Sequence, residues 1–117
     1  EKVRPVIGPE TLGMSRSNGI TREGGLPAAY GTEHVLYWGA QGMDAVKDGP
    51  AVTYRNMGKL LIGSGTGART PAVDAAAALR LKAGVPCEIH EDILYRQCSK
   101  LMLNVGLNQV CAVYNVP

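Results

Sequence analysis

One stretch near the end of the chain decides how the rest is interpreted: residues 98–108, which read CSKLMLNVGLN. The stretch predicts a helix whose apolar residues surround the whole circumference, which is typical of a buried helix. Polar side chains interrupt it at intervals of four residues: Lys100, Asn104 and Asn108. Because residues four apart differ by only about 40° around an α-helix, these three are expected to form one polar stripe.

That polar stripe needs a partner. A lysine and two carboxamides are costly to bury without hydrogen bonds, so the stripe faces solvent, another polar element or a ligand. Asparagine is also a poor residue for a helix interior unless its amide is used. From the residues alone, a polar contact between helices and a ligand site both remain open.

Composition is that of an ordinary globular protein. Of the 117 residues, 45% are hydrophobic and 19% are charged, and the net charge is +2. A chain of this length can form one modest domain with a core. The sequence has no run of basic residues that would indicate nucleic-acid binding. It also has no apolar run of the ~18 residues that a membrane span needs. Without a signal peptide, we expect a cytoplasmic protein.

The cysteines lie far apart in the sequence, at Cys87, Cys98 and Cys111, with no C-x-x-C pair. An odd number on apolar segments favours reduced thiols in a core over a disulfide framework, and we expect no metal site. The chain begins at Glu1 in a helix-tolerant segment and ends at Pro117, directly after the predicted last helix. We therefore interpret it as a segment of a longer protein.

The order of hydrophobic runs and turns predicts an α/β fold. Strands are predicted at 11–15, 34–43, 51–55, 59–63 and 85–90, and helices at 23–30, 72–83 and 93–114. Short turns separate the three central strands, which suggests an antiparallel meander. Thr70-Pro71 is a helix start, and Asp92 is expected to cap the last helix.

A glycine-rich loop, GSGTG at 63–67, follows a predicted strand and precedes a helix, as phosphate-binding loops do. Its spacing is G-x-G-x-G rather than G-x-G-x-x-G, and no Gly-Lys-Ser/Thr follows. Pro71 also removes one N–H group from the helix start. We interpret the segment as a surface loop.

Asn18-Gly19 follows a short predicted strand and indicates a turn. The alternative is that Asn18 projects from the end of a sheet strand, where ligands of open α/β sheets bind. The pattern alone does not separate a turn from a ligand contact.

Taken in order, these pieces resemble the ketopantoate reductase family (2-dehydropantoate 2-reductases). The resemblance rests on SNGI at 17–20, KLLIG at 59–63, GVP at 84–86 and K-L-x-x-N-x-x-x-N at 100–108, in one collinear register. It implies that residues 1–91 form the later part of a Rossmann-like NADP-binding domain that includes antiparallel strands. Residues 92–117 would then form the first long helix of an all-helical domain.

The resemblance implies an NADPH-dependent oxidoreductase that reduces 2-dehydropantoate to pantoate in pantothenate biosynthesis. Lys100 would bind the keto oxygen, where a fixed ammonium stabilises the charge left by hydride transfer. Asn104 and Asn108 would hydrogen-bond the substrate, and Asn18 would contact both cofactor and substrate. The implied partners are a small 2-keto acid and NADPH, and neither nucleic acid nor a membrane is expected to bind. Formation of a homodimer stays an open alternative.

The chain also departs from the family pattern. Cys98 occupies the position of an aromatic residue two places before the lysine, and Asn108-Gln109 replaces the family's Asn-Pro. The family's glycine-rich nucleotide fingerprint and its later glutamate and serine are not in the chain. Two alternatives remain: a reductase of the same fold acting on another 2-keto acid, and a non-catalytic helical module whose polar stripe pairs with a partner helix.

Overall fold

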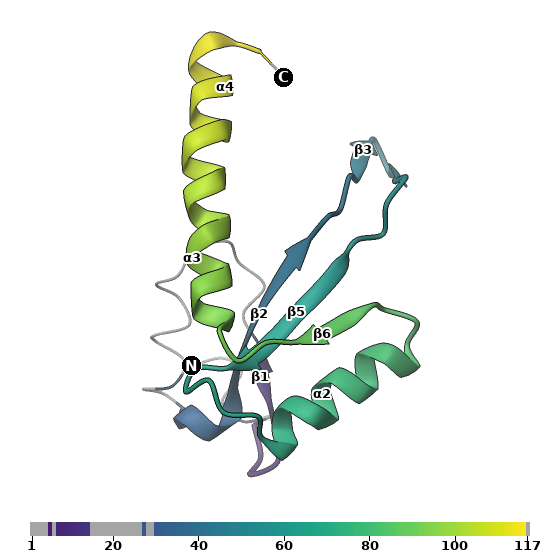
Figure 1. Cartoon of the computed structure of the whole chain (residues 1–117). Coiled ribbons are helices and arrows are strands. Elements are labelled where there is room, and N and C mark those ends of the chain that lie inside the picture. The colour runs from purple at the N-terminus through teal and green to yellow at the C-terminus, as the bar shows by residue number, and fades with distance from the viewer. Residues whose placement is uncertain (1–4, 6, 15–26, 28–29, 117) are drawn as a thin grey trace.

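The computed structural model describes residues 5, 7–14, 27 and 30–116. The described strands are β1 (Gly13–Met14), β2 (Val35–Gln41), β3 (Val46–Asp48), β4 (Ala51–Thr53), β5 (Lys59–Ser64) and β6 (Cys87–Ile89). The helical elements are η2 (Thr32–His34), α2 (Pro71–Lys82), α3 (Ile93–Leu103), η3 (Asn104–Asn108) and α4 (Gln109–Tyr114) (Figure 1). The α/β fold expected from the sequence is confirmed, whereas the helix predicted at 23–30 lies largely outside the described residues.

The main sheet has four strands in the order β1-β2-β5-β6. Its centre is the antiparallel pair β2–β5, in which Trp38 lies opposite Ile62. On the outer sides, β1 runs parallel to β2 and β6 runs parallel to β5. A parallel pair needs a crossover connection, which α2 provides between β5 and β6.

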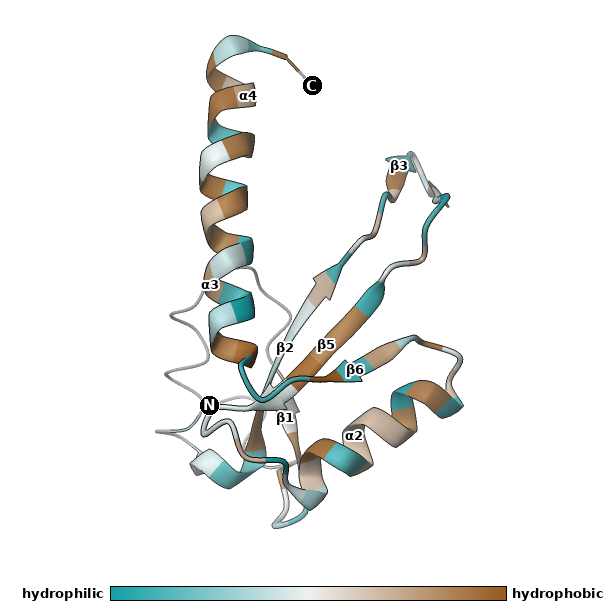
Figure 2. Ribbon diagram, in the orientation of Figure 1, coloured by the Kyte–Doolittle hydropathy of each residue, from teal (hydrophilic) through white to brown (hydrophobic). Residues whose placement is uncertain are grey.

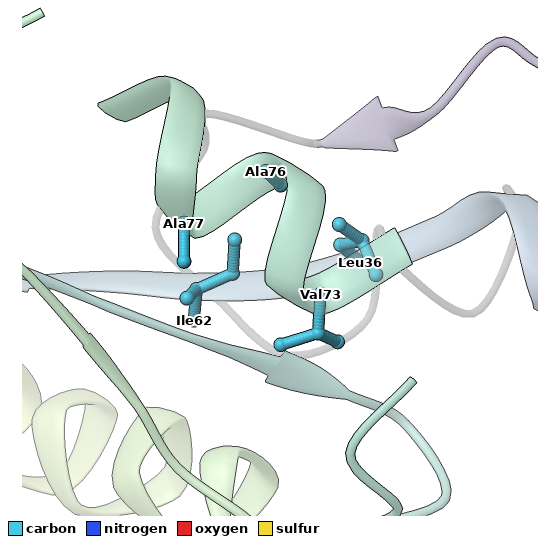
Figure 3. Packing of buried hydrophobic residues seen from close by; sticks show 5 residues of the cluster. All are labelled: Leu36, Ile62, Val73, Ala76 and Ala77. Carbon is cyan, nitrogen blue, oxygen red and sulfur yellow. The ribbon is translucent and has the colours of Figure 1, made fainter. Parts of the chain in front are cut away.

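The two faces of this sheet meet different helices. Neighbouring residues of β5 point to opposite faces, so Ile62 faces α2 and Leu61 faces α3. The core on the α2 face comprises Leu36, Ile62, Val73, Ala76 and Ala77 (Figure 3). The two alanines bring the α2 backbone close to the strands.

Helix α2 begins and ends as its sequence predicts. The Thr70 hydroxyl accepts the backbone N–H of Val73 at 3.3 Å, and Pro71 occupies the first helical position, where a missing N–H costs nothing. Gly84 follows the helix with a φ of +74°, a left-handed conformation that favours glycine.

The strands between residues 35 and 64 form one long hairpin, so the predicted three-stranded meander is wrong in its pairing. β4 pairs with β3, with Asp48 opposite Ala51, and β5 returns to pair with β2. Between the two ladders, the Asp44 carboxylate accepts the backbone N–H groups of Arg55 at 2.8 Å and Asn56 at 2.7 Å. These side-chain contacts replace strand-to-strand bonds and separate the outer hairpin from the main sheet.

Residues 93–114 (α3, η3 and α4) form one continuous helical rod, here called the C-terminal rod, which extends away from the sheet (Figure 1). The predicted long helix is confirmed, and it continues without a break through Asn108 and Gln109. Asp92 precedes it, but its side chain makes no capping hydrogen bond, so the predicted side-chain cap is wrong. Its carboxylate instead lies 3.4 Å from both His90 Nδ1 and Arg96 Nε.

The distal half of the C-terminal rod is exposed, so the predicted burial of this helix is wrong for the described chain. Val113 and Tyr114 of α4 are 79% and 72% exposed, and Met102 near the end of α3 is 74% exposed. Figure 2 shows hydrophobic residues along the whole length of the rod. The reason is that no described element other than η3 packs extensively on α4.

The three cysteines, all within the described residues, form no disulfide. Cys87 is half-buried in β6, and this burial raises the pKa of its thiol, in keeping with the predicted reduced core thiol. Cys98 is exposed on α3 and Cys111 is half-buried on α4, so the core prediction is wrong for Cys98. None of the helices in the described ranges has the length and hydrophobicity of a membrane-spanning segment.

Candidate functional site

A pocket of about 470 Å³ opens between helix α3 and the distal half of strand β2. Residues 39–43 form one wall, and the helix face from Arg96 to Asn104 forms the other. We call it the α3–β2 pocket. Its volume lies within the range of small-molecule sites, about 300–1,000 Å³.

Lys100 is fixed at the centre of the helix wall. Its ammonium donates a hydrogen bond to the backbone carbonyl of Ala40 at 2.9 Å, and the residue is half-buried. An ammonium group has three N–H donors, so two are left for a ligand after the bond to Ala40. The structure therefore places the predicted catalytic lysine at the pocket with its head group already positioned.

Gln97 supports the same wall one turn earlier. Its side chain is 9% exposed, and Nε2 donates to the backbone carbonyl of Trp38 at 3.0 Å. Trp38 and Ala40 are two residues apart on β2, so their carbonyl groups point to the same edge of the strand. Sequence reasoning missed Gln97. It lies three residues before Lys100 and so shares its helix face, but that spacing alone does not distinguish it from an ordinary surface glutamine.

The charged side chains that line the pocket are both basic. They are Lys100 and Arg96, and the described lining residues include no aspartate or glutamate. Arg96 has one ionic contact in the described chain, between its Nε and Asp92 Oδ2 at 3.4 Å. Lys100, which has no acidic partner among the described residues, suits an anionic ligand, because hydrogen bonds between charged groups and carboxylates are stronger than neutral ones.

The predicted polar stripe divides along the rod. Asn104 is half-buried and lines the α3–β2 pocket with Lys100, whereas Asn108 is exposed and is not among the described lining residues. The two asparagines bound η3, a π-helical turn. Such turns occur mostly as single-turn insertions in α-helices and are frequent at functional sites.

Asn18, the fourth predicted site residue, lies outside the described residues. The nearest described residue before it is Met14, which pairs with Leu36 of β2. The same strand carries the carbonyl groups of Trp38 and Ala40 that the helix side chains bind. The expected role of Asn18 therefore stays a prediction.

The glycine-rich loop after β5 is internally bonded. The Ser64 hydroxyl donates to the carbonyl of Ala68 at 2.7 Å and lies 3.1 Å from the Thr66 hydroxyl. The backbone N–H groups of Gly67 and Ala68 also bond within the loop, to Ser64 and Thr66, and Pro71 has no N–H, so these groups do not form a cradle for phosphate oxygens. Within the described ranges, no group of three or more histidine, cysteine, aspartate or glutamate side chains could hold a metal ion.

Three solved structures share this fold over nearly the whole chain. A 2-dehydropantoate 2-reductase from Geobacter metallireducens GS-15 matches with a TM-score of 0.81 at 24% identity, over 97% of this chain and 38% of its own. The 2-dehydropantoate 2-reductase from Porphyromonas gingivalis W83 matches with a TM-score of 0.83 at 22% identity, over 98% of this chain and 40% of its own. The 2-dehydropantoate 2-reductase from Methylococcus capsulatus matches with a TM-score of 0.76 at 23% identity, over 97% of this chain and 37% of its own.

The sequence comparisons give no match to a family model or to a curated protein. The chain thus shares its fold with these reductases and spans 37% to 40% of the length of the three solved structures.

Proposed function

We propose that this chain is part of a longer NADPH-dependent reductase of 2-keto acids, with 2-dehydropantoate as the first substrate to test. The observation that carries the proposal is the Lys100 ammonium, held 2.9 Å from the Ala40 carbonyl in a pocket whose charged lining residues are basic. The fold shared with three 2-dehydropantoate 2-reductases supports it.

Lys100 has the central chemical role in this proposal. When bound, NADPH supplies the hydride that forms the new C–H bond at the keto carbon. The C=O π electrons then move to oxygen, and the Lys100 ammonium stabilises this developing negative charge. The same ammonium can transfer a proton to that oxygen, which gives the hydroxy acid, and the amine recovers its proton from solvent.

The other pocket residues hold the substrate. The Asn104 amide has no hydrogen-bond partner among the described residues, and it lies one helical turn from Lys100 on the same wall. It can donate to the substrate carboxylate, and Arg96 adds positive charge. Asn108 and Asn18 keep their predicted substrate and cofactor contacts as part of the proposal.

The described residues provide a pocket for the substrate but no site that fits the phosphates of the cofactor. The α3–β2 pocket has the size and charge for a keto acid, whereas the glycine-rich loop at 63–67 uses its hydroxyl groups internally. We therefore assign the phosphates of NADPH to residues outside the described ones.

The test is an assay of NADPH oxidation by the intact protein with a panel of 2-keto acids. The proposal expects turnover of 2-dehydropantoate. A clear preference for another 2-keto acid would identify the first alternative, a reductase of the same fold with a different substrate. No oxidation with any 2-keto acid would contradict the proposal and favour the non-catalytic helical module.

A further inference from the structure

The orientation of the Gln97 amide follows from its partner. The Trp38 carbonyl oxygen can only accept a hydrogen bond, so the group 3.0 Å from it must be the Gln97 NH₂. The carbonyl oxygen of this amide, Oε1, therefore points away from the Trp38 carbonyl.

Gln97 Oε1 has no hydrogen-bond partner among the described residues, although its side chain is only 9% exposed. Buried polar atoms in folded proteins are nearly always hydrogen-bonded, because an unpaired acceptor retains the cost of losing water. Gln97 also lines the α3–β2 pocket. A ligand in that pocket can supply the missing donor.

We propose that Gln97 Oε1 accepts a hydrogen bond from a hydroxyl group of the substrate and thereby selects hydroxylated 2-keto acids. This inference rests on the proposed function, because Lys100 must bind the keto oxygen for the hydroxyl to reach Gln97. Side chains three residues apart on a helix have Cβ atoms about 5–6 Å apart. The hydroxyl-bearing carbon of 2-dehydropantoate lies two carbons from its keto carbon, so the two polar groups can meet neighbouring side chains on one helix face.

The hydroxyl proton of the substrate needs an acceptor in the pocket. Lys100 and Arg96 can only donate hydrogen bonds, so neither can accept the hydroxyl proton. Ser99 is also in the lining and donates its hydroxyl proton to the Tyr95 carbonyl at 2.9 Å, but it is less buried than Gln97, so its oxygen has less need of a donor from the substrate. Gln97 offers a buried neutral oxygen on the same wall.

The test compares two substrates that differ by one hydroxyl group: 2-dehydropantoate and 3,3-dimethyl-2-oxobutanoate. In the intact protein, Gln97→Met keeps the side-chain length and removes the acceptor. We expect the ratio of the two kcat/KM values to fall by at least about tenfold, mainly through a higher KM for the hydroxylated acid. Gln109→Met, on the exposed face of α4, should leave the ratio unchanged.

A second variant separates binding from support of the fold. Gln97→Glu retains carboxylate acceptors but loses the donor to the Trp38 carbonyl, so it should keep most of the preference for the hydroxylated acid. The inference would be overturned if Gln97→Met lowered kcat/KM equally for both substrates. It would also be overturned if Gln97→Glu lost as much preference for the hydroxylated acid as Gln97→Met does, because either result would show a structural role. Lack of turnover of either acid by the unmodified protein would overturn the inference, and lack of turnover of every 2-keto acid in the panel would overturn the proposed function as well.

Discussion

Gly63 shows how tightly the sheet and the C-terminal rod are joined. A Cβ atom at this position would lie 2.9 Å from the Cβ of Ile93 and would also contact the His90 carbonyl oxygen. Ile93 is fully buried at the first position of α3. The base of the rod therefore has little room to shift, which keeps Lys100 at a constant position relative to β2.

Gly63→Ala should destabilise the protein by about 1–3 kcal/mol, the usual cost of overpacking a well-packed site. Urea unfolding measures this change. Gly39→Ala is the matched control, because Gly39 also lies in a central strand and an added Cβ there meets nothing within 4 Å. Equal stability of the two variants would show that Ile93 and His90 can move to make room for the added methyl group.

The spacing of Lys100 and Asn104 was enough to predict that both would face one site. Gln97 could not be recognised in the same way, because glutamine is an ordinary surface residue of helices and its value depends on the Trp38 carbonyl, 59 residues away in sequence. A local pattern reports which residues share a helix face. It does not report which strand that face will meet.

At the scale of elements, the Asp44 carboxylate holds the base of the outer hairpin. The backbone N–H of Asn56 keeps the pKa of this carboxyl below its ordinary value, with help from the N–H of Arg55 and the Asn56 side-chain amide. The folded state therefore favours the ionised form. The ionised Asp44 carboxylate stabilises the fold fully above its ordinary pKa of about 3.9. This stabilisation is lost as the pH falls through the lowered pKa of the folded state.

Acidification should therefore open the junction between the two hairpin ladders. We expect the hydrogen-exchange protection of the Arg55 and Asn56 amides to decrease when the pH falls from about 5 to below about 3. Asp44→Ala should remove this protection at all pH values, whereas Asp48→Ala, at the hairpin tip, should not. Protection that is independent of pH in the unmodified protein would contradict this role of Asp44.

The elements themselves followed well from local sequence, but their pairing did not. Hydrophobic runs and turn residues predicted β2, β5, α2 and the rod close to their observed bounds. The pairing of β4 with β3 depends on the Asp44 contacts and on Gly58, whose φ of +68° brings the chain close to Gln41. Such interruptions leave no periodic signal in a single sequence.

For the whole molecule, the main unexplained feature is the apolar surface of the C-terminal rod. A helix that is hydrophobic on all sides is normally buried, yet the distal half of this rod is exposed. The apolar pattern predicted burial, which is wrong for the described chain, because a pattern within one helix does not identify a segment that covers it. We propose that further helices of the longer protein cover the rod, in line with the 37% to 40% of the matched structures that the chain spans.

In isolation, the chain should associate through this surface. Light scattering should show a mass that increases with concentration. Met102→Lys with Val113→Lys should raise the dissociation constant by at least about tenfold, or ~1.4 kcal/mol. Leu79→Lys is the control, since Leu79 is 66% exposed but lies on α2. A stable monomer, or an equal effect of Leu79→Lys, would show that the rod surface is not responsible.

The most direct test of the account is the rate of 2-dehydropantoate reduction by the intact protein carrying Lys100→Met. We expect kcat/KM to fall by about 100-fold or more, because the charge partner of the developing oxyanion is lost. Lys82→Met, at the exposed end of α2, removes the same charge elsewhere and should leave the rate nearly unchanged. A Lys100→Met enzyme that reduces 2-dehydropantoate as fast as the Lys82→Met enzyme would contradict the central claim.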